Sequence, residues 1–177
     1  GDVQNGVVQG THELDTVVAN VGRLVDKARQ ERVPVVWVQH SDDELVRGSP
    51  EWRWVPELAP AEHEPLVHKR YNSAFEETTL EVELARLGAT HIALAGAATN
   101  WCIRATAYGA LDRGYDLTLL KDAHTTSAID LGNGARVEAA GIVADLNVVM
   151  TWATYPGRRN AAAKAAEVDF GVPGGGR

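Results

Sequence analysis

The sequence predicts a three-layer α/β/α protein in which helices cover both faces of a mostly parallel central sheet. Two observations lead to this prediction. Short apolar segments alternate along the chain with segments of helical periodicity, and several of the joins between them are short, as in βαβ units. The length of 177 residues is typical of one domain. We place this domain at residues 1–170 and expect a mobile, glycine-rich tail at 171–177.

The first part of the chain is predicted to contain the loop that follows a first strand, then a helix, a strand and a long loop. Residues 2–6 have the composition of a loop that leaves a strand, so we expect a short apolar segment before Gly1. Residues 14–28 repeat apolar side chains at intervals of three and four, which predicts an amphipathic helix. The β-branched run at 33–38 predicts a strand that is covered on both faces. Residues 40–65 are charged and aperiodic, and a loop of that length is usually functional or disordered.

The middle of the chain is predicted to form two strands around a helix with defined ends. Residues 66–68 predict a short strand. Thr78 and Glu81 have the spacing of a capping box at a helix start. Gly88 suits the left-handed position just after a helix end, and residues 91–95 predict the next strand.

The last part of the chain is predicted to alternate in the same way. A helix is expected at 101–113, with Asn100 as its N-cap. Residues 116–120 predict a strand, and the alanine-rich residues 134–146 predict a helix. Residues 147–151 have the composition of a closing strand.

Composition and charge argue against several classes of function. The chain carries 17 basic and 24 acidic residues, and a net charge of −7 repels nucleic acid. There is no run of about 18 apolar residues, so we expect no membrane partner. The only cysteine is Cys102, which excludes an internal disulfide and a four-cysteine zinc site. The printed sequence shows no signal peptide, from which we expect a cytoplasmic location.

Three residues at the expected ends of strands carry chemistry that can work together. Cys102 follows the strand at 91–95 through small residues, in the first turn of the next helix, where a thiolate and an oxyanion are stabilised. Asp2 ends the first strand and Lys69 follows the strand at 66–68. Taken alone, these residues have plainer interpretations: a small buried hydrophobe, a turn former and a solvated lysine. Together, at one edge of a parallel sheet, they predict a nucleophile, a base and a cation.

The motifs around these residues resemble those of the isochorismatase-like cysteine hydrolases. The chain reads Asp-Val-Gln-Asn at 2–5 and Lys-x-x-x-Ser-Ala-Phe at 69–75. It reads Gly-Ala-Ala-Thr-Asn-Trp-Cys-Ile-x-x-Thr-Ala at 96–107, which is the most specific part of the resemblance. The resemblance covers about residues 2–151 and implies the family's Rossmann-like fold.

The resemblance also implies roles for individual residues. The family's catalytic triad is Asp, Lys and Cys, which corresponds to Asp2, Lys69 and Cys102. A cis peptide bond is implied between Ala97 and Ala98, and it would let the N–H groups of Ala98 and Cys102 form an oxyanion hole. The implied reaction is hydrolysis of a small-molecule amide or lactam through a thioester, with Asp2 as the base. Family members form dimers or larger assemblies, so a homo-oligomer is implied as well.

The departures from related families bear on cofactors and on the bond that is cleaved. Nicotinamidases of the same superfamily hold a metal through Asp-x-His and a further His, whereas the matching region here reads Gln39-His40-Ser41-Asp42. We therefore expect no metal and no cofactor, with a metal on His40 and Asp42 as the alternative. Isochorismatases proper cleave a vinyl ether without the cysteine, so Cys102 favours cleavage of a C–N bond.

Two other functions stay open at this point. The first is a cysteine-independent hydrolase of a non-amide bond, with Asp2 as the acid. The second is a binding domain that keeps the fold and has no catalytic activity.

Several aromatic and histidine side chains are predicted to line the substrate pocket. Trp52 and Trp54 in the long loop either form a wall of the pocket or attach the loop to the body. The segments 39–40, 49–54 and 122–126 loosely resemble the subgroup that includes streptothricin hydrolase. The predicted pocket residues are His40, Trp52, Trp54, Tyr71, Trp101 and His124.

Overall fold

The computed structural model describes residues 1–171, so most of the predicted mobile tail at 171–177 lies outside the described residues. Two groups of parallel strands form the sheet. The first pairs β1 (Trp37–His40) with β2 (Leu66–Lys69). The second has the order β3 (His91–Ala97), β4 (Asp116–Thr125) and β7 (Asn160–Ala163).

The N-terminal residues connect these two groups at the centre of the sheet. The N–H of Asp2 donates to the carbonyl of Val38 at 3.0 Å, and the N–H of Ala97 donates to the carbonyl of Gly1 at 3.2 Å. The backbone of residues 1–3 therefore lies between β1 and β3. A Cβ atom at Gly96 would collide with the carbonyl oxygen of Gly1, and φ is +127° there, so the close approach requires glycine.

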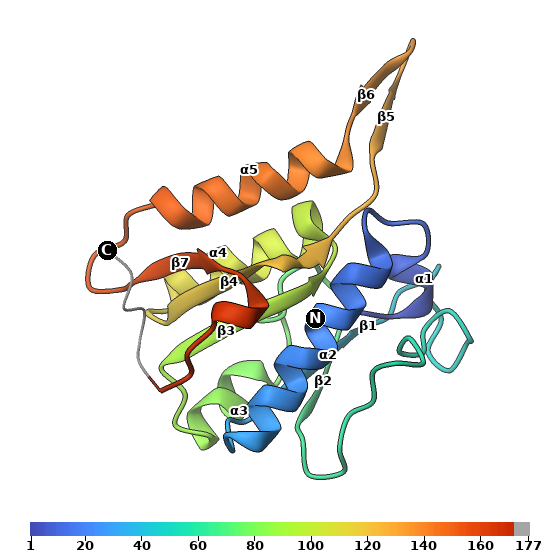
Figure 1. Ribbon diagram of the computed structural model, residues 1–177. Coiled ribbons are helices and arrows are strands. Elements are labelled where there is room, and N and C mark those ends of the chain that lie inside the picture. The colour runs from blue at the N-terminus through green and yellow to red at the C-terminus, as the bar shows by residue number, and fades with distance from the viewer. Residues whose placement is uncertain (172–177) are drawn as a thin grey trace.

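Helices cover both faces of this sheet, which confirms the predicted three layers (Figure 1). One face carries α2 (Leu14–Gln30) with the short helices α1 (Asn5–Val8) and η2 (Ala165–Glu167). The other face carries α3 (Leu80–Arg86), the π-helical turn η1 (Thr99–Ile103), α4 (Arg104–Asp112) and α5 (Ala139–Trp152). Each face has its own buried apolar cluster, as a sheet covered on both sides requires.

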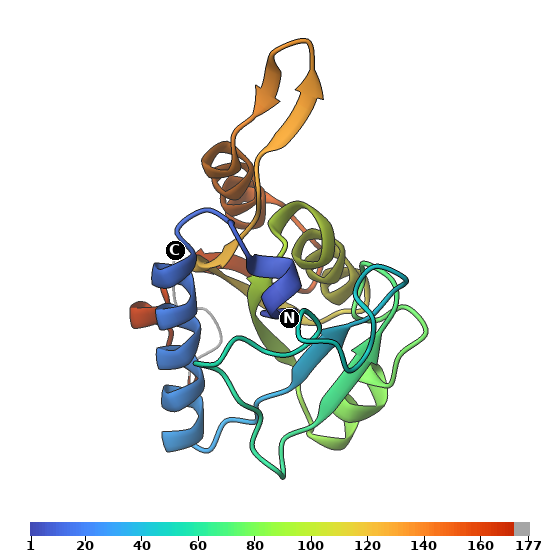
Figure 2. The ribbon, with the colours of Figure 1, turned by 90° about the vertical axis from the view of Figure 1, so that its right-hand side faces the viewer.

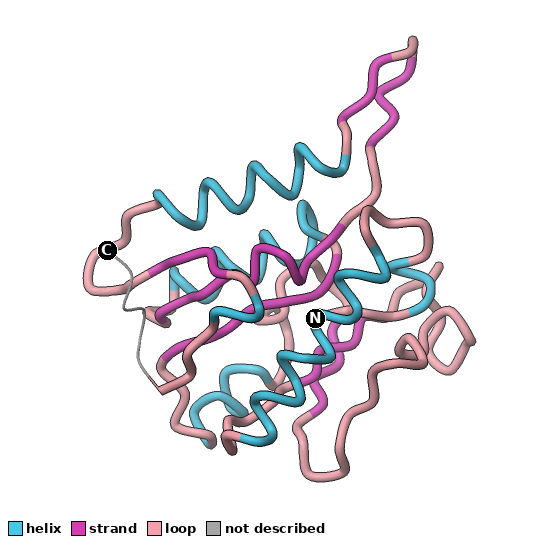
Figure 3. The backbone as a smooth tube through the Cα atoms, in the orientation of Figure 1, coloured by secondary structure: helices cyan, strands magenta, loops and turns pink. Residues whose placement is uncertain are grey.

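Several elements of the first two thirds follow the prediction. The helix at 14–28 is confirmed as α2, and the long loop after β1 is drawn without helix or strand in Figure 3. The predicted strand at 33–38 starts later, because β1 begins at Trp37. Gly88 is confirmed as the residue after α3, with φ of +66°. The N–H groups of Gly88 and Ala89 close the helix end on the carbonyls of Ala85 and Leu84.

The capping box predicted for α3 is wrong. Thr79 rather than Thr78 is the N-cap residue and its side chain makes no capping hydrogen bond, while Thr78 Oγ1 accepts the N–H of Leu80, the first helical residue, at 3.2 Å. The carboxylate of Glu81 instead accepts a hydrogen bond from Arg113 Nε at 3.0 Å. Glu81, whose side chain a capping box would use, is thus ion-paired with Arg113 at the C-terminal end of α4.

The last third of the chain departs from the prediction. β5 (Ile129–Gly132) and β6 (Ala135–Val137) form an antiparallel hairpin that projects from the body (Figures 1 and 2). The predicted helix at 134–146 is therefore wrong in its first residues, and the predicted strand at 147–151 is wrong because α5 continues to Trp152. Within residues 1–171, no helix has the length and apolar character needed to cross a membrane.

Candidate active site

The structure brings the side chains of Asp2, Lys69 and Cys102 together at one edge of the sheet. Lys69 Nζ lies 3.0 Å from Asp2 Oδ2 and 3.1 Å from Cys102 Sγ. The side chains of Asp2 and Lys69 are each 1% exposed, whereas Cys102 is partly exposed. Cys102 is therefore the most exposed residue of the three.

Three different elements deliver these side chains. Lys69 is the last residue of β2 and pairs in register with His40, the last residue of β1. Asp2 lies in the segment between β1 and β3. Cys102 lies in η1, directly after β3. The carboxyl ends of the parallel strands thus converge as the sequence predicts.

The turn that carries Cys102 differs from the predicted helix start. It is a π-helical turn that begins at Thr99, with Ala98 as N-cap. Asn100 does not cap it, because its Oδ1 accepts a hydrogen bond from Thr126 Oγ1 at 2.7 Å. The peptide bond between Ala97 and Ala98 is cis. Short π-helical turns often mark functional sites.

The ammonium group of Lys69 has a defined partner for each of its three hydrogens. It donates to Cys102 Sγ, to the carbonyl of Tyr71 at 2.9 Å and to His40 Nδ1 at 3.0 Å. The Asp2 carboxylate faces the same ammonium, and both its oxygens are buried without an accepted hydrogen bond of good geometry from any described residue. That carboxylate has free lone pairs, so it is the group placed to accept a proton.

The pKa of the Cys102 thiol is raised, whereas the sequence predicts that the helix start lowers it. Burial raises the pKa of the Cys102 thiol to about 11, and the negative charge of Asp2 raises it further, while Lys69 opposes the shift. The prediction that the helix start would favour a resting thiolate is therefore wrong. At neutral pH the sulfur is a thiol, and it needs a base at the moment of attack.

His40 belongs to the site, in contact with Lys69. Its Nε2 lies 2.8 Å from Asp42 Oδ2, and its Nδ1 faces Lys69, so protein groups occupy both ring nitrogens. The alternative of a metal on His40 and Asp42 would need one of these contacts to break. Among residues 1–171, no cluster of three His, Cys, Asp or Glu side chains could hold a metal ion.

Two of the predicted pocket tryptophans contact the body of the protein. The ring of Trp54 meets that of Trp37 edge to face at 5.1 Å, inside the apolar cluster beneath α2. Trp54 therefore attaches the long loop to the body, which was the alternative role expected for it, and its place in the substrate pocket stays a prediction. The ring of Trp52 stacks on His68 at 6.3 Å, and its carbonyl accepts a hydrogen bond from Gln4 Nε2 at 2.7 Å.

The other three predicted pocket residues divide into exposed and buried. Tyr71 is 50% exposed and Trp101 is 57% exposed, and both lie beside catalytic candidates in the chain. His124 is 2% exposed and cannot line a pocket, so that prediction is wrong. Its ring bridges Thr99 Oγ1 and Asn147 Oδ1, each at 2.8 Å, and thereby ties η1 to α5. Burial lowers the pKa of His124, so this bridge is neutral.

Sequence reasoning missed the role of Gln4. Its fully buried amide donates to the carbonyls of His40 and Trp52, and its Oε1 accepts the N–H of His40 at 2.8 Å. Gln4 therefore fixes the end of β1 and the long loop beside Asp2. The sequence did contain an indication, because Gln4 lies in a segment expected at the sheet, and a buried amide needs hydrogen-bond partners.

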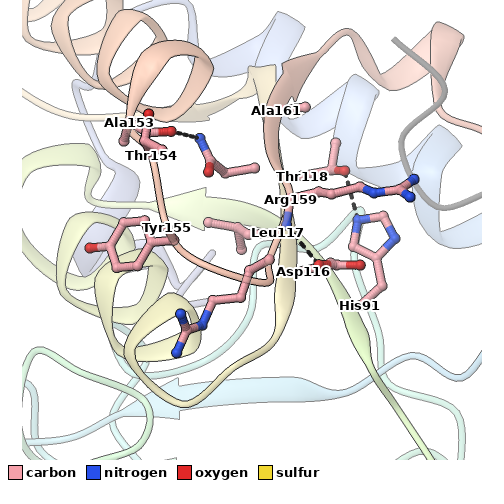
Figure 4. Close-up of a pocket in the computed structure, with 11 residues that line it drawn as sticks. His91, Asp116, Leu117, Thr118, Ala153, Thr154, Tyr155, Arg159 and Ala161 are labelled. Carbon is pink, nitrogen blue, oxygen red and sulfur yellow. Dashed lines mark hydrogen bonds between the residues drawn. The ribbon is translucent and has the colours of Figure 1, made fainter. Parts of the chain in front are cut away.

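A cavity of about 280 Å³ lies at the other edge of the sheet (Figure 4). It is lined by the first residues of three strands, which are His91, Asp116 and Asn160. None of the predicted site residues lines it. The cavity therefore belongs to a different part of the molecule from the Cys102 site.

Comparisons with known proteins found a family match and several relatives. A protein-family model described as the isochorismatase domain matches residues 1–154. The streptothricin hydrolase of Streptomyces noursei is 30% identical over 139 residues, which cover 75% of this chain and 55% of that protein. The maleamate amidohydrolase of Pseudomonas putida is 33% identical over 89 residues, or 49% of this chain and 42% of that protein. This chain spans about half the length of these two hydrolases.

Two further comparisons extend the match. The secreted isochorismatase effector Isc1 of Verticillium dahliae is 28% identical over 129 residues, which cover 69% of this chain and 68% of that protein. The crystal structure of an isochorismatase from Pseudomonas putida KT2440 has a TM-score of 0.85 and 28% identity, and covers 95% of this chain and 87% of that chain. The fold is therefore shared over almost the whole chain.

Proposed function

The chain belongs to the isochorismatase family of hydrolases, and from that premise we propose that it hydrolyses a small-molecule amide or lactam through a Cys102 thioester. The observation that carries the proposal is the contact of Lys69 Nζ with both Asp2 and Cys102, at a sulfur that is partly exposed. The similarity to an amidohydrolase supports a C–N bond as the target.

The first half of the proposed reaction forms the thioester. Asp2 takes the thiol proton as Cys102 Sγ attacks the amide carbon. The oxyanion that forms accepts hydrogen bonds from the N–H groups of Ala98 and Cys102. The C–N bond then breaks, and Asp2 returns the proton to the leaving nitrogen.

The second half of the reaction regenerates the thiol. A water molecule attacks the thioester carbon while Asp2 takes its proton, and the sulfur leaves as a thiolate that Asp2 reprotonates. Lys69 stays an ammonium throughout and stabilises the charge on the sulfur. The raised pKa of the Cys102 thiol fits this scheme, because proton removal is then coupled to attack.

The proposal uses no metal or cofactor, since Asp2, Lys69 and Cys102 supply every proton and charge that it needs. Its partner is the small-molecule substrate, and we propose that the exposed side chains of Tyr71 and Trp101, which are near Lys69 and Cys102 in the sequence, contact it. We propose a cytoplasmic location, where the single thiol stays reduced, although one relative is a secreted effector. We also propose a homo-oligomer, to be tested by light scattering of the purified chain.

Intact-mass measurement after incubation with a panel of small amides and lactams tests the function. We expect a substrate-dependent acyl adduct on the wild-type chain and none on the Cys102→Ala variant, which also loses turnover. Cys102 is the sole cysteine, so the adduct has one site. Turnover that survives in Cys102→Ala would overturn the proposal in favour of a cysteine-independent hydrolase. The absence of turnover and adduct across the panel would favour a binding domain.

A further inference from the structure

We propose that His40 and Asp42 are positioning residues that hold Lys69 against the sulfur of Cys102. The inference deepens the proposed function and rests on Cys102 as its nucleophile. Its basis is a chain of contacts from the exposed Asp42 through His40 to the buried ammonium group of Lys69.

The two strands bring His40 and Lys69 together. They are register partners at the ends of β1 and β2, so their side chains project from the same edge of the sheet. His40 Nδ1 lies 3.0 Å from Lys69 Nζ. An ammonium group has three donors and no acceptor, so Nδ1 accepts this hydrogen bond and carries no proton.

This contact determines the rest of the chain of hydrogen bonds. With Nδ1 unprotonated, the neutral ring carries its proton on Nε2 and donates it to Asp42 Oδ2 at 2.8 Å. The other carboxylate oxygen of Asp42 accepts the N–H groups of Glu44 and Leu45 at 2.9 and 2.7 Å. The hydrogen bond from Leu45, followed by that of His40, lowers the pKa of Asp42 and keeps it ionised. Asp42 therefore fixes the orientation and tautomer of His40.

The consequence for Cys102 follows from counting donors. Lys69 Nζ has three N–H bonds and four neighbours: His40 Nδ1, the carbonyl of Tyr71, Cys102 Sγ and, at 3.0 Å, Asp2 Oδ2. Without the His40 acceptor, the freed N–H bond turns toward the Asp2 carboxylate, which draws the ammonium away from the sulfur, the weakest acceptor of the group. Asp2, Lys69, Asp42 and the N-terminal amine of Gly1 are charged or titratable groups near His40 or the sulfur. Loss of the acceptor therefore weakens the stabilisation of the thiolate.

The rate of Cys102 alkylation by iodoacetamide between pH 7.5 and 9.5, followed by intact mass, tests this inference without any substrate. We expect His40→Leu to alkylate about tenfold more slowly at each pH, because the thiol then ionises at higher pH. His40→Asn should retain most of the wild-type rate, since its amide oxygen can accept the Lys69 hydrogen bond. Asp42→Ala should fall between the two, and the exposed neighbour Asp43→Ala is the matched control. Circular dichroism and melting temperature establish that each variant is folded.

Two results would overturn the inference. One is a folded His40→Leu variant with the wild-type alkylation profile. The other is equal slowing in His40→Leu and His40→Asn, which would assign the effect to packing. Because the assay needs no amide, the positioning role can stand if no substrate is found, and amide hydrolysis can stand if His40 proves dispensable.

Discussion

The two edges of the sheet hold charged side chains in different ways. At the carboxyl edge, Asp2 and Lys69 are almost fully buried and meet at one point. At the amino edge, Asp116 and His91 line a cavity, and each has a local partner: Asp116 accepts the N–H of Arg159 at 2.7 Å, and His91 contacts Thr118 at 2.8 Å (Figure 4).

This difference separates a cavity from a reactive site. The amino edge has the cavity, and the side chains of His91 and Asp116 there are hydrogen-bonded to residues of neighbouring segments. The carboxyl edge holds a buried carboxylate with unused lone pairs beside a partly exposed sulfur. The Asp2 carboxylate is ion-paired with Lys69, but burying carboxylate oxygens without hydrogen bonds is costly, and such groups cluster at functional sites. Equivalent substitutions at the two edges test whether they differ in this way.

The largest contrast is expected between Asp2→Asn and Asp116→Asn. Asp2→Asn should reduce amide hydrolysis by about 10²–10⁴-fold, because the general base is lost. The same variant should alkylate faster, since the charge of Asp2 helps to raise the pKa of the Cys102 thiol. Steady-state hydrolysis and iodoacetamide kinetics measure the two effects, and Asp116→Asn should leave both unchanged. Slower alkylation in Asp2→Asn would contradict this account of the thiol.

An intermediate effect is expected on stability at alkaline pH. The pKa of the Cys102 thiol is about 11 in the fold against an ordinary 9.0. As pH rises above 9, the unfolded chain loses its thiol proton first, so stability that is fully present below pH 9 is lost between about pH 9 and 11. Urea unfolding should show that the wild type loses about 1–3 kcal/mol more over this range than Cys102→Ser. Parallel stability curves for the two proteins would mean that the thiol is not desolvated.

The carboxyl edge was also the part that the sequence predicted best, for a physical reason. Asp2, Lys69 and Cys102 lie at strand ends, and parallel topology alone brings such ends together. His124 has the same position in its strand, but its contacts with Thr99 and Asn147 bury it behind the site, and those partners are distant in the sequence. The acceptors around Lys69 likewise come from three elements, so spacing within one motif could not identify them.

The errors in the fold came from segments whose composition is ambiguous. Residues 147–151 include three β-branched side chains, but they continue a helix in which Leu146 and Met150 are buried while Val148 is exposed. Every fourth residue of this helix is buried because the helix packs against the body of the protein, and the composition of a short segment does not reveal that packing. β7 consists of one asparagine and three alanines, which have little strand preference, and it forms because β4 offers it a parallel partner.

The smallest effect is expected from His91→Gln at the amino edge. Burial lowers the pKa of His91, with Asp116 opposing the shift, so the folded protein disfavours the charged ring. As pH falls through the ordinary value of 6.5, the unfolded chain binds the proton first, and stability that is present above that value is lost. The wild type should therefore lose slightly more stability than His91→Gln between pH 7 and 5.5, by less than about 1 kcal/mol. Hydrolysis and Cys102 alkylation should not change in the variant. A change in either rate would mean that the two edges are coupled through β3. The cavity at the amino edge could then no longer be treated as separate from the reactive site at the carboxyl edge.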